Sequence, residues 1–206
     1  NIASIPESYP GSPVRRSEIN RRTAETDVEV ELCLDGPLQT EAVGTGVGFL
    51  DHMLELFARH SGFGLRLSCR GDTEVDAHHS VEDTGLALGE ALREALGDKR
   101  GIRRYGGIAL PMDEALVLCA VDLSGRPCLR YAAQIPSQKV GEFDTELVRE
   151  FMQALANSAG MALHIRQLDG ENSHHIIEAM FKALGRALAE AVEVVGEDIP
   201  STKGVL

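Results

Sequence analysis

A short motif of metal-binding residue types occurs twice in this chain, and its repetition constrains the fold. Residues 78–82 (His-His-Ser-Val-Glu) and residues 174–178 (His-His-Ile-Ile-Glu) share the pattern His-His-x-x-Glu, 96 positions apart. Each copy opens a segment in which apolar residues recur at helical spacing, which predicts one helix ending near residue 96 and another ending near residue 195. The two copies indicate a duplicated fold in which each half carries one motif.

The segments before the two motifs follow the same predicted order of elements. In the first half we expect two strands, a helix and a third strand, at about residues 27–34, up to 44, 50–59 and 65–69. The second half repeats this order at about residues 115–123, 129–133, 145–158 and 161–166. When Gly62 is aligned with Gly160, His52 falls opposite Glu150, each ten residues earlier.

This order predicts an α+β fold of two β-β-α-β-α half-domains related by a pseudo-twofold axis, with strands on one side and helices on the other. We expect the halves at residues 14–98 and 99–206, packed as one compact unit. Residues 1–13 are rich in Pro and Ser and are interpreted as a disordered lead-in. A solenoid is excluded because there are only two copies and the period is too long.

The composition limits the partners and the compartment. A net charge of −12 makes nucleic acid or an anionic membrane surface an improbable partner, and no apolar run is long enough to span a membrane. Cysteines occur at positions 33, 69, 119 and 128 without Cys-x-x-Cys spacing. We therefore expect buried free thiols in a reducing cytoplasm.

The His-His-x-x-Glu motifs predict metal sites. Residues three or four apart share one helix face, so His79 can share a metal ion with Glu82, and His175 with Glu178. The pseudo-twofold then gives two crossed ligand sets: His52, His79, Glu82 and His174; and Glu150, His175, Glu178 and His78. Imidazole and carboxylate ligands without thiolate suit Mn²⁺, Fe²⁺ or Zn²⁺, and we favour Mn²⁺. The alternative is a polar cluster at each helix start.

Several longer segments resemble the imidazoleglycerol-phosphate dehydratase family of histidine biosynthesis. They are residues 49–53 (Phe-Leu-Asp-His-Met), 78–83, 122–127 (Asp-Leu-Ser-Gly-Arg-Pro), 163–166 (Leu-His-Ile-Arg) and 172–175 (Asn-Ser-His-His). The resemblance covers about residues 14–206 and implies a duplicated fold like domain 2 of ribosomal protein S5. It also implies two Mn²⁺ ions per active site, active sites between subunits and a 24-mer. Some members of the family have a histidine where this chain has Glu150.

The resemblance also implies a reaction and the residues that perform it. D-erythro-imidazole glycerol phosphate would lose water through a metal-bound imidazolate to give imidazole acetol phosphate, which is a carbon–oxygen lyase reaction. Glu25, in Thr23-Ala24-Glu25-Thr26, would contact the substrate and move the proton, although from sequence alone it is only a charge before a strand. The other candidate substrate- or phosphate-binding residues are His60, Arg104, Arg126, Lys182, Ser201, Thr202 and Lys203. Of these, His60 falls outside the repeated ligand scheme, and from sequence alone it is interpreted as a structural residue or a neighbour of the ligands.

Two further features and two other function classes complete the interpretation. The glycine-rich segment 44–48 lacks the full dinucleotide-binding spacing, so we interpret it as a flexible approach to His52. Asp113 and Glu114 are interpreted as a charged turn. A di-metal hydrolase and a non-catalytic metal-binding or assembly protein stay open as alternatives. The set of candidate phosphate-binding cations favours an enzyme over a storage protein.

Overall fold

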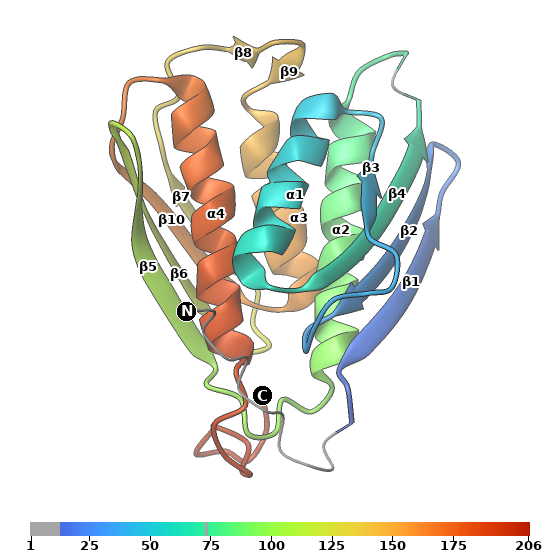
Figure 1. Ribbon diagram of the computed structural model, residues 1–206, viewed down its shortest axis with the longest axis vertical. Helices are drawn as coiled ribbons and strands as arrows, with labels where there is room; N and C mark the ends of the chain where they lie inside the picture. The colour runs from blue at the N-terminus through green and yellow to red at the C-terminus, as the bar shows by residue number, and fades with distance from the viewer. Residues whose placement is uncertain (1–12, 73) are drawn as a thin grey trace.

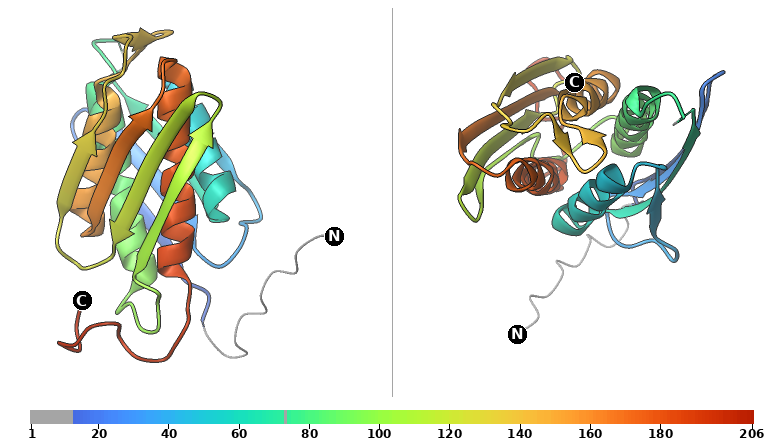
Figure 2. Two further views of the ribbon diagram at one scale, coloured as in Figure 1. Left: turned by 90° about the vertical axis from the view of Figure 1, so that its left-hand side faces the viewer. Right: turned by 90° about the horizontal axis from the view of Figure 1, so that it is seen from above.

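Two four-stranded sheets form the outer layers of the protein, and four helices lie between them (Figure 1). The computed structural model describes residues 13–72 and 74–206, so the expected lead-in at residues 1–13 lies outside the described residues except for Pro13. Each half is a sheet covered on its inner face by helices, and the halves meet helix to helix (Figure 2). The predicted α+β class is confirmed, and the arrangement agrees with a duplicated half-domain. Among the helices described, none is long and apolar enough to cross a membrane.

The two halves repeat the same elements in the same order. The first contains β1 (Arg16–Arg22), β2 (Thr26–Cys33), β3 (Ala42–Gly44), α1 (Gly48–Ser61), β4 (Gly64–Gly71) and α2 (His78–Leu96). The second contains β5 (Tyr105–Met112), β6 (Ala115–Asp122), β7 (Cys128–Ala132), α3 (Leu147–Ala159), β10 (Ala162–Asp169) and α4 (Ser173–Val192). The short strands β8 (Lys139–Val140) and β9 (Phe143–Asp144) form a hairpin between β7 and α3. The sheet orders, β1-β2-β4-β3 and β5-β6-β10-β7, are equivalent, and the last strand of each is parallel to its neighbour.

Each four-stranded sheet has one more strand than the sequence predicts, so the repeated unit is corrected to β-β-β-α-β-α, with the β8–β9 hairpin added in the second half. The added strands are β1 and β5, which pair along the outer edges of the two sheets. In β1 only Ser17 and Ile19 turn toward the core, and charged residues surround them. In β5 two glycines and Pro111 weaken the strand signal, because glycine packs no side chain and proline donates no ladder hydrogen bond. Edge pairing with β2 and β6 stabilises both segments as strands.

The inner faces of the central strands form the core as their alternation predicts. Val28, Val30 and Leu32 of β2 are buried, and so are Val117 and Val121 of β6. The helices contribute long apolar faces that are almost entirely covered. Three of the four free cysteines are buried as expected, but Cys128 is exposed because it points outward at the start of β7.

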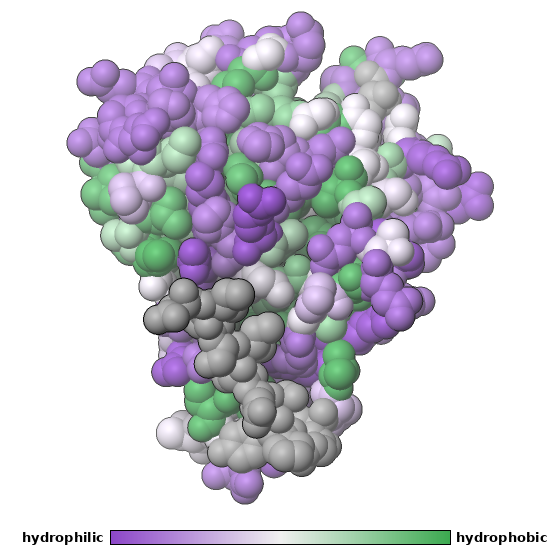
Figure 3. Space-filling view, viewed as in Figure 1, coloured by the Kyte–Doolittle hydropathy of each residue, from purple (hydrophilic) through white to green (hydrophobic). Residues whose placement is uncertain are grey.

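The outward faces of the two sheets differ in chemistry, although their topology is the same. The first is charged, and its buried Glu31 pairs with Arg16 and Arg66. On the second, small and apolar residues dominate three of the four strands: Gly107, Ala109, Pro111, Leu116, Leu118, Ala120, Ala132 and Cys128. Figure 3 shows hydrophobic residues gathered along the left edge of the molecule, near β5. Covering the second face would therefore remove few charges from water.

Glycines allow the helices to cross at backbone contact. A Cβ at Gly185 of α4 would lie 2.8 Å from the carbonyl oxygen of Phe57 in α1. Gly89, at the equivalent position of α2, would bring a Cβ to 2.7 Å from the carbonyl oxygen of Leu155 in α3. Both separations are shorter than an ordinary Cβ contact, so each crossing needs glycine. The α1–α4 crossing fixes how closely the first turns of these two helices approach each other.

We predict that Gly185→Ala lowers the free energy of unfolding by about 1–3 kcal/mol, because the added methyl group overpacks the α1–α4 crossing. Gly48→Ala is the matched control: this glycine is also helical, but no atom lies within 4 Å of the position of its Cβ. The control should be neutral or slightly stabilising, since alanine favours a helix more than glycine does. Denaturant unfolding measures the free energy of unfolding of both variants. If Gly185→Ala were as stable as Gly48→Ala, the crossing would not require glycine.

Candidate functional site

The four helices all begin at the same end of the molecule, and this gathers the predicted ligands there (Figure 1). The two His-His pairs stand in the first turns of α2 and α4. His52 lies in the second turn of α1, and Glu150 lies in the first turn of α3. The sequence repeat therefore becomes two related groups of side chains at one end of the fold.

His52, His174 and Glu178 form a group that can hold a metal ion. One ligand atom from each lies within 4.8 Å of the others. His174 Nε2 is 3.3 Å from Glu178 Oε2, and the His52 ring centroid is 6.2 Å from that of His174. Two imidazoles and one carboxylate are a donor set that Mn²⁺, Fe²⁺ and Zn²⁺ all accept. Helices α1 and α4 of one chain thus supply three candidate ligands.

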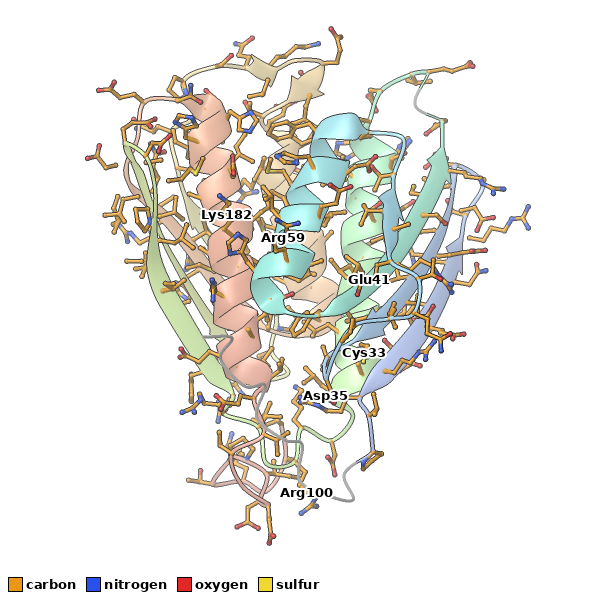
Figure 4. All side chains as sticks on the ribbon, in the orientation of Figure 1. Cys33, Asp35, Glu41, Arg59, Arg100 and Lys182 are labelled. Carbon is orange, nitrogen blue, oxygen red and sulfur yellow. The ribbon has the colours of Figure 1, made fainter. Side chains whose placement is uncertain are left out.

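Cations lie beside this group, along the α1–α4 crossing. Figure 4 labels two of them, Lys182 on α4 and Arg59 on α1. Burial alone would raise the pKa of Glu178, but the Lys182 ammonium, 2.8 Å away, lowers that pKa below its usual value and keeps the carboxylate ionised. Burial, and then the positive charges of Arg186 and Lys182, lower the pKa of His60. The crossing therefore combines a metal-binding donor set with a positively charged neighbourhood.

Carboxylates from a neighbouring turn hold the second histidine of the second pair. His175 Nδ1 donates a hydrogen bond to Glu114 Oε2 at 2.7 Å, and Asp113 Oδ2 lies 3.7 Å from His175 Nε2. This hydrogen bond raises the pKa of His175 and lowers the pKa of Glu114 to about 2. A carboxylate on Nδ1 orients an imidazole so that Nε2 is available to a metal ion.

His79 has equivalent surroundings in the first half. Its Nδ1 is 3.4 Å from Asp72 Oδ2, and its Nε2 is 3.5 Å from Glu25 Oε2. The hydrogen bond with Asp72 raises the pKa of His79. Glu25 lies in the turn between β1 and β2, and Asp113 lies in the turn between β5 and β6. The duplication thus places one hairpin carboxylate beside the second histidine of each pair.

The side-chain contacts within each motif differ from the pairing predicted for the metal ligands, which stays a prediction. Three-residue spacing predicts that Glu82 shares a metal ion with His79, and Glu178 with His175. In the structure each glutamate faces the first histidine of its motif, four residues earlier, at 3.4 Å for His78–Glu82. Spacings of three and four both lie on one helix face. The hairpin carboxylates decide between them, because they hold the second histidine away from the glutamate.

Neither predicted four-ligand set comes together inside one chain. His52 and His174 lie together at the α1–α4 crossing, whereas their expected companions His79 and Glu82 stand in the first two turns of α2. The second set is divided too: Glu178 lies with His52, while the other members are His78 on α2, Glu150 on α3 and His175 beside Glu114. Across residues 13–72 and 74–206, the His52 group is the one that reaches three-ligand distance.

Several predicted phosphate-binding residues lie at the end of the folded molecule that is opposite the helix starts. Arg104 precedes β5 and Arg126 follows β6, at the strand ends remote from the β5–β6 turn. Arg104 binds the carboxylate of Asp122 at 2.8 and 3.3 Å and donates to the carbonyl of Pro200 at 3.0 Å. This contact tethers the chain just before Ser201, Thr202 and Lys203. By contrast, Lys182 and His60 lie along the α1–α4 crossing.

Three carboxylates make contacts that were not predicted from the sequence, and one segment is better held in place than expected. Asp113 and Glu114 do form a turn, but they face His175, and their place opposite the Glu25 turn in the repeat was a usable signal. Asp72 has no such signal, because it simply follows β4. The glycine-rich segment is not a loose approach to His52: Thr45 is fully buried, and its hydroxyl and N–H both donate to Asp51.

Comparison with known proteins points to one family. A sequence model of the family described as imidazoleglycerol-phosphate dehydratase matches residues 45–188. The chain is 56% identical over 196 residues to the imidazoleglycerol-phosphate dehydratase of Synechococcus sp. (strain WH7803), covering 94% of this chain and 96% of that protein. It is 57% identical to that of Ruegeria pomeroyi, covering 94% and 100%.

Two solved structures have the same fold. One is the enzyme from Pyrococcus furiosus in complex with (S)-C348, with a TM-score of 0.80, 41% identity, and coverage of 91% of this chain and 100% of that chain. The other is imidazoleglycerol-phosphate dehydratase from Staphylococcus aureus N315, with a TM-score of 0.78, 40% identity, and coverage of 88% and 99%.

We predict that Glu114→Gln lowers the pKa of His175 in the metal-free protein, because it removes the acceptor that favours the imidazolium. Since the folded pKa of His175 is raised and that of Glu114 is lowered to about 2, their pairing stabilises the folded protein fully between about pH 4.5 and pH 6.5. The contribution declines as pH rises through the raised pKa of His175, and also as pH falls toward 2 and Glu114 is protonated. The pH dependence of imidazole C2–H exchange, followed by mass spectrometry, measures the pKa. Glu171→Gln makes the same chemical change at an exposed neighbouring site and should leave His175 unchanged. An unaltered pKa in Glu114→Gln would refute the assignment.

Proposed function

This chain belongs to the imidazoleglycerol-phosphate dehydratase family, and we propose that it converts D-erythro-imidazole glycerol phosphate to imidazole acetol phosphate in L-histidine biosynthesis. The reaction is that of a carbon–oxygen hydro-lyase. The observation that carries the proposal is the group of His52, His174 and Glu178 with Lys182 beside it. A metal-binding donor set next to a cation suits a substrate that has both an imidazole ring and a phosphate.

We propose two Mn²⁺ ions per active site, with Fe²⁺ or Zn²⁺ as alternatives. The nitrogen and oxygen donors support this choice, since thiolate ligands are absent from the candidate set. The proposed ligands are His52, His78, His79, Glu82, Glu150, His174, His175 and Glu178. When bound, the ions would act as Lewis acids toward the imidazole ring and the departing hydroxyl group.

Glu25 is the proposed proton-transfer residue. Its side chain is 52% exposed, so it can meet a substrate, and its carboxylate is 3.5 Å from the Nε2 of the candidate ligand His79. A carboxylate is suited to take a proton from carbon and to return it during the loss of water. In this proposal His79 would hold a metal ion that binds the imidazole ring of the substrate. A general base beside His79 would therefore lie near the carbon next to that ring.

We further propose that the active sites lie between subunits of a 24-mer. Arg104, Arg126 and residues 201–203 lie far from the His-His pairs of their own chain, so one chain brings only part of the proposed phosphate-binding set, Lys182 and His60, to the metal-binding group. Ligand sets that stay incomplete within a chain support the same conclusion. The sparsely charged outer face of the second sheet offers a surface that another subunit can cover.

We predict that protein stripped with a chelator turns over imidazole glycerol phosphate only after Mn²⁺ is restored.

We also predict that Glu25→Gln lowers kcat by about 100-fold or more with metal content retained, because general acid–base catalysis contributes roughly 10²–10⁴-fold. Chromatographic measurement of imidazole acetol phosphate gives both rates.

Glu29→Gln is the matched control for this experiment, since Glu29 is an exposed glutamate on the outer face of the same sheet. It should turn over normally. Full activity in verifiably metal-free protein would reject the metal requirement, and a loss of less than about tenfold in Glu25→Gln would reject the role of Glu25.

We predict that removing the metal shifts the protein to smaller species and that Mn²⁺ restores the large one, because ligands supplied by different chains link metal binding to assembly. Acid should act in the same direction, since a protonated histidine cannot bind metal. Analytical ultracentrifugation measures the species, with chelator already saturated by Mn²⁺ as the control. A metal-free sample of unchanged mass would show that the metal does not join subunits.

A further inference from the structure

A buried hydroxyl group lies next to the turn that carries Glu25. Thr26, the first residue of β2, is 3% exposed, and its Oγ1 donates a hydrogen bond to the carboxylate of Asp83 on α2, which is 9% exposed. Arg21 provides a second, longer contact to Asp83 at 3.8 Å. A polar bond in such a buried place fixes the distance between strand and helix, because breaking it would leave the carboxylate with few partners.

The Thr26–Asp83 bond runs alongside the Glu25–His79 contact. Asp83 is four residues after His79, so the two side chains stand one turn apart on the same face of α2. Thr26 directly follows Glu25. The start of β2 therefore meets α2 at two adjoining points, one buried and one exposed, with the exposed pair 3.5 Å apart. A shift that changed the buried Thr26–Asp83 contact would therefore also change the distance between Glu25 and His79.

Thr23 carries this constraint to the backbone of Glu25. Its Oγ1 accepts the N–H of Glu25 at 3.1 Å and the N–H of Thr26 at 3.0 Å, and it lies 3.2 Å from Thr26 Oγ1. Since the hydroxyl proton of Thr26 is given to Asp83, Thr23 is the donor to Thr26. A continuous chain of hydrogen bonds thus leads from Asp83 through Thr26 and Thr23 to the peptide of Glu25.

The same point also fixes the other side of His79. Thr26 pairs with Gly71 in the β2–β4 register, and a Cβ at Gly71 would lie only 3.3 Å from Thr26 Cγ2. The next residue, Asp72, contacts His79 Nδ1. Thr26 therefore lies between the two short segments whose carboxylates flank the imidazole.

We propose that Thr26, through its bond to Asp83, is a positioning residue that holds Glu25 at its distance from His79; this rests on the proposed function, in which Glu25 moves the proton. The hydroxyl does not touch the substrate. It acts by limiting the freedom of the turn at residues 23–26, and proton transfer depends steeply on such placement, since a displacement of about 1 Å can cost roughly 100-fold in rate.

Thr26→Val tests this, because valine has nearly the same shape but cannot donate a hydrogen bond. In the full-length, Mn²⁺-loaded protein, kcat should fall roughly 10–100-fold, with KM and metal content unchanged. Thr26→Ser, which keeps the hydroxyl, should restore kcat to near the unsubstituted value. Peptides that contain residues 23–26 should exchange their amide hydrogens faster in Thr26→Val. A normal kcat in Thr26→Val would overturn the proposal.

Ser17→Ala is the matched control for a purely structural effect. The Ser17 hydroxyl is 4% exposed and donates to the carbonyl of Ala91 at 2.6 Å, so it is another buried bond between the first sheet and α2, at the far end of that helix. Its loss should lower stability and leave kcat unchanged. If Ser17→Ala reduced kcat as much as Thr26→Val, the effect would be general loosening and the proposal would fall.

Two further variants keep the test decisive. Thr23 is exposed, so Thr23→Val should fold even if Thr26→Val does not, and it should lower kcat in the same way. In a Glu25→Gln background, Thr26→Val should cause no additional loss. If Glu25→Gln is inactive but Thr23→Val and Thr26→Val keep normal kcat, the positioning inference alone fails. If Glu25→Gln is fully active, the proposed role of Glu25 fails first.

Discussion

The close crossing of α1 and α4 is the constraint on which the candidate metal centre depends. His52 belongs to one helix, and His174 and Glu178 belong to the other, more than 100 residues later in the chain. Their ligand atoms meet because the backbones touch at Gly185, where a side chain would collide with the carbonyl of Phe57. Lys182, one turn beyond Glu178, lies in the same crossing, so packing alone determines both the donor set and the charge beside it.

The duplication provides two such crossings but does not fill them alike. Gly89 brings α2 against α3 as Gly185 brings α4 against α1. Opposite His52, however, the second half has Glu150, so the corresponding residues are two carboxylates and one imidazole rather than the reverse. Among the described residues, Glu150, His78 and Glu82 do not form a group at ligand distance, unlike His52, His174 and Glu178. The same scaffold thus offers two chemically different environments.

Much of the fold was predictable because the hydrophobic period is strong where an element is buried on one face. Residues 28–32, the apolar run of β6 and both motif helices follow this rule. The edge strands β1 and β5 do not, because pairing with a neighbour, rather than their own pattern, makes them strands. The side-chain contacts inside the motifs were not predictable for a related reason. Local spacing permits either histidine to face the glutamate, and the choice depends on contacts from outside the helix: Asp72, which follows β4, and Glu114, which lies in the β5–β6 turn far from His175 in sequence. Tertiary contacts of this kind leave no periodic signal.

The candidate metal ligands and several candidate phosphate-binding residues lie at opposite ends of the folded molecule, and this has a consequence for the proposed function. The His-His pairs stand at the helix starts, while Arg104 ties the segment before residues 201–203 to the opposite end through Asp122 and the carbonyl of Pro200. The substrate is short, so it cannot reach from the His-His pairs to Arg104 and residues 201–203 within one subunit. If both groups bind it, the far end of a neighbouring chain must face the helix starts. In such an arrangement an isolated subunit would hold metal weakly and phosphate poorly, so assembly itself would create the active site.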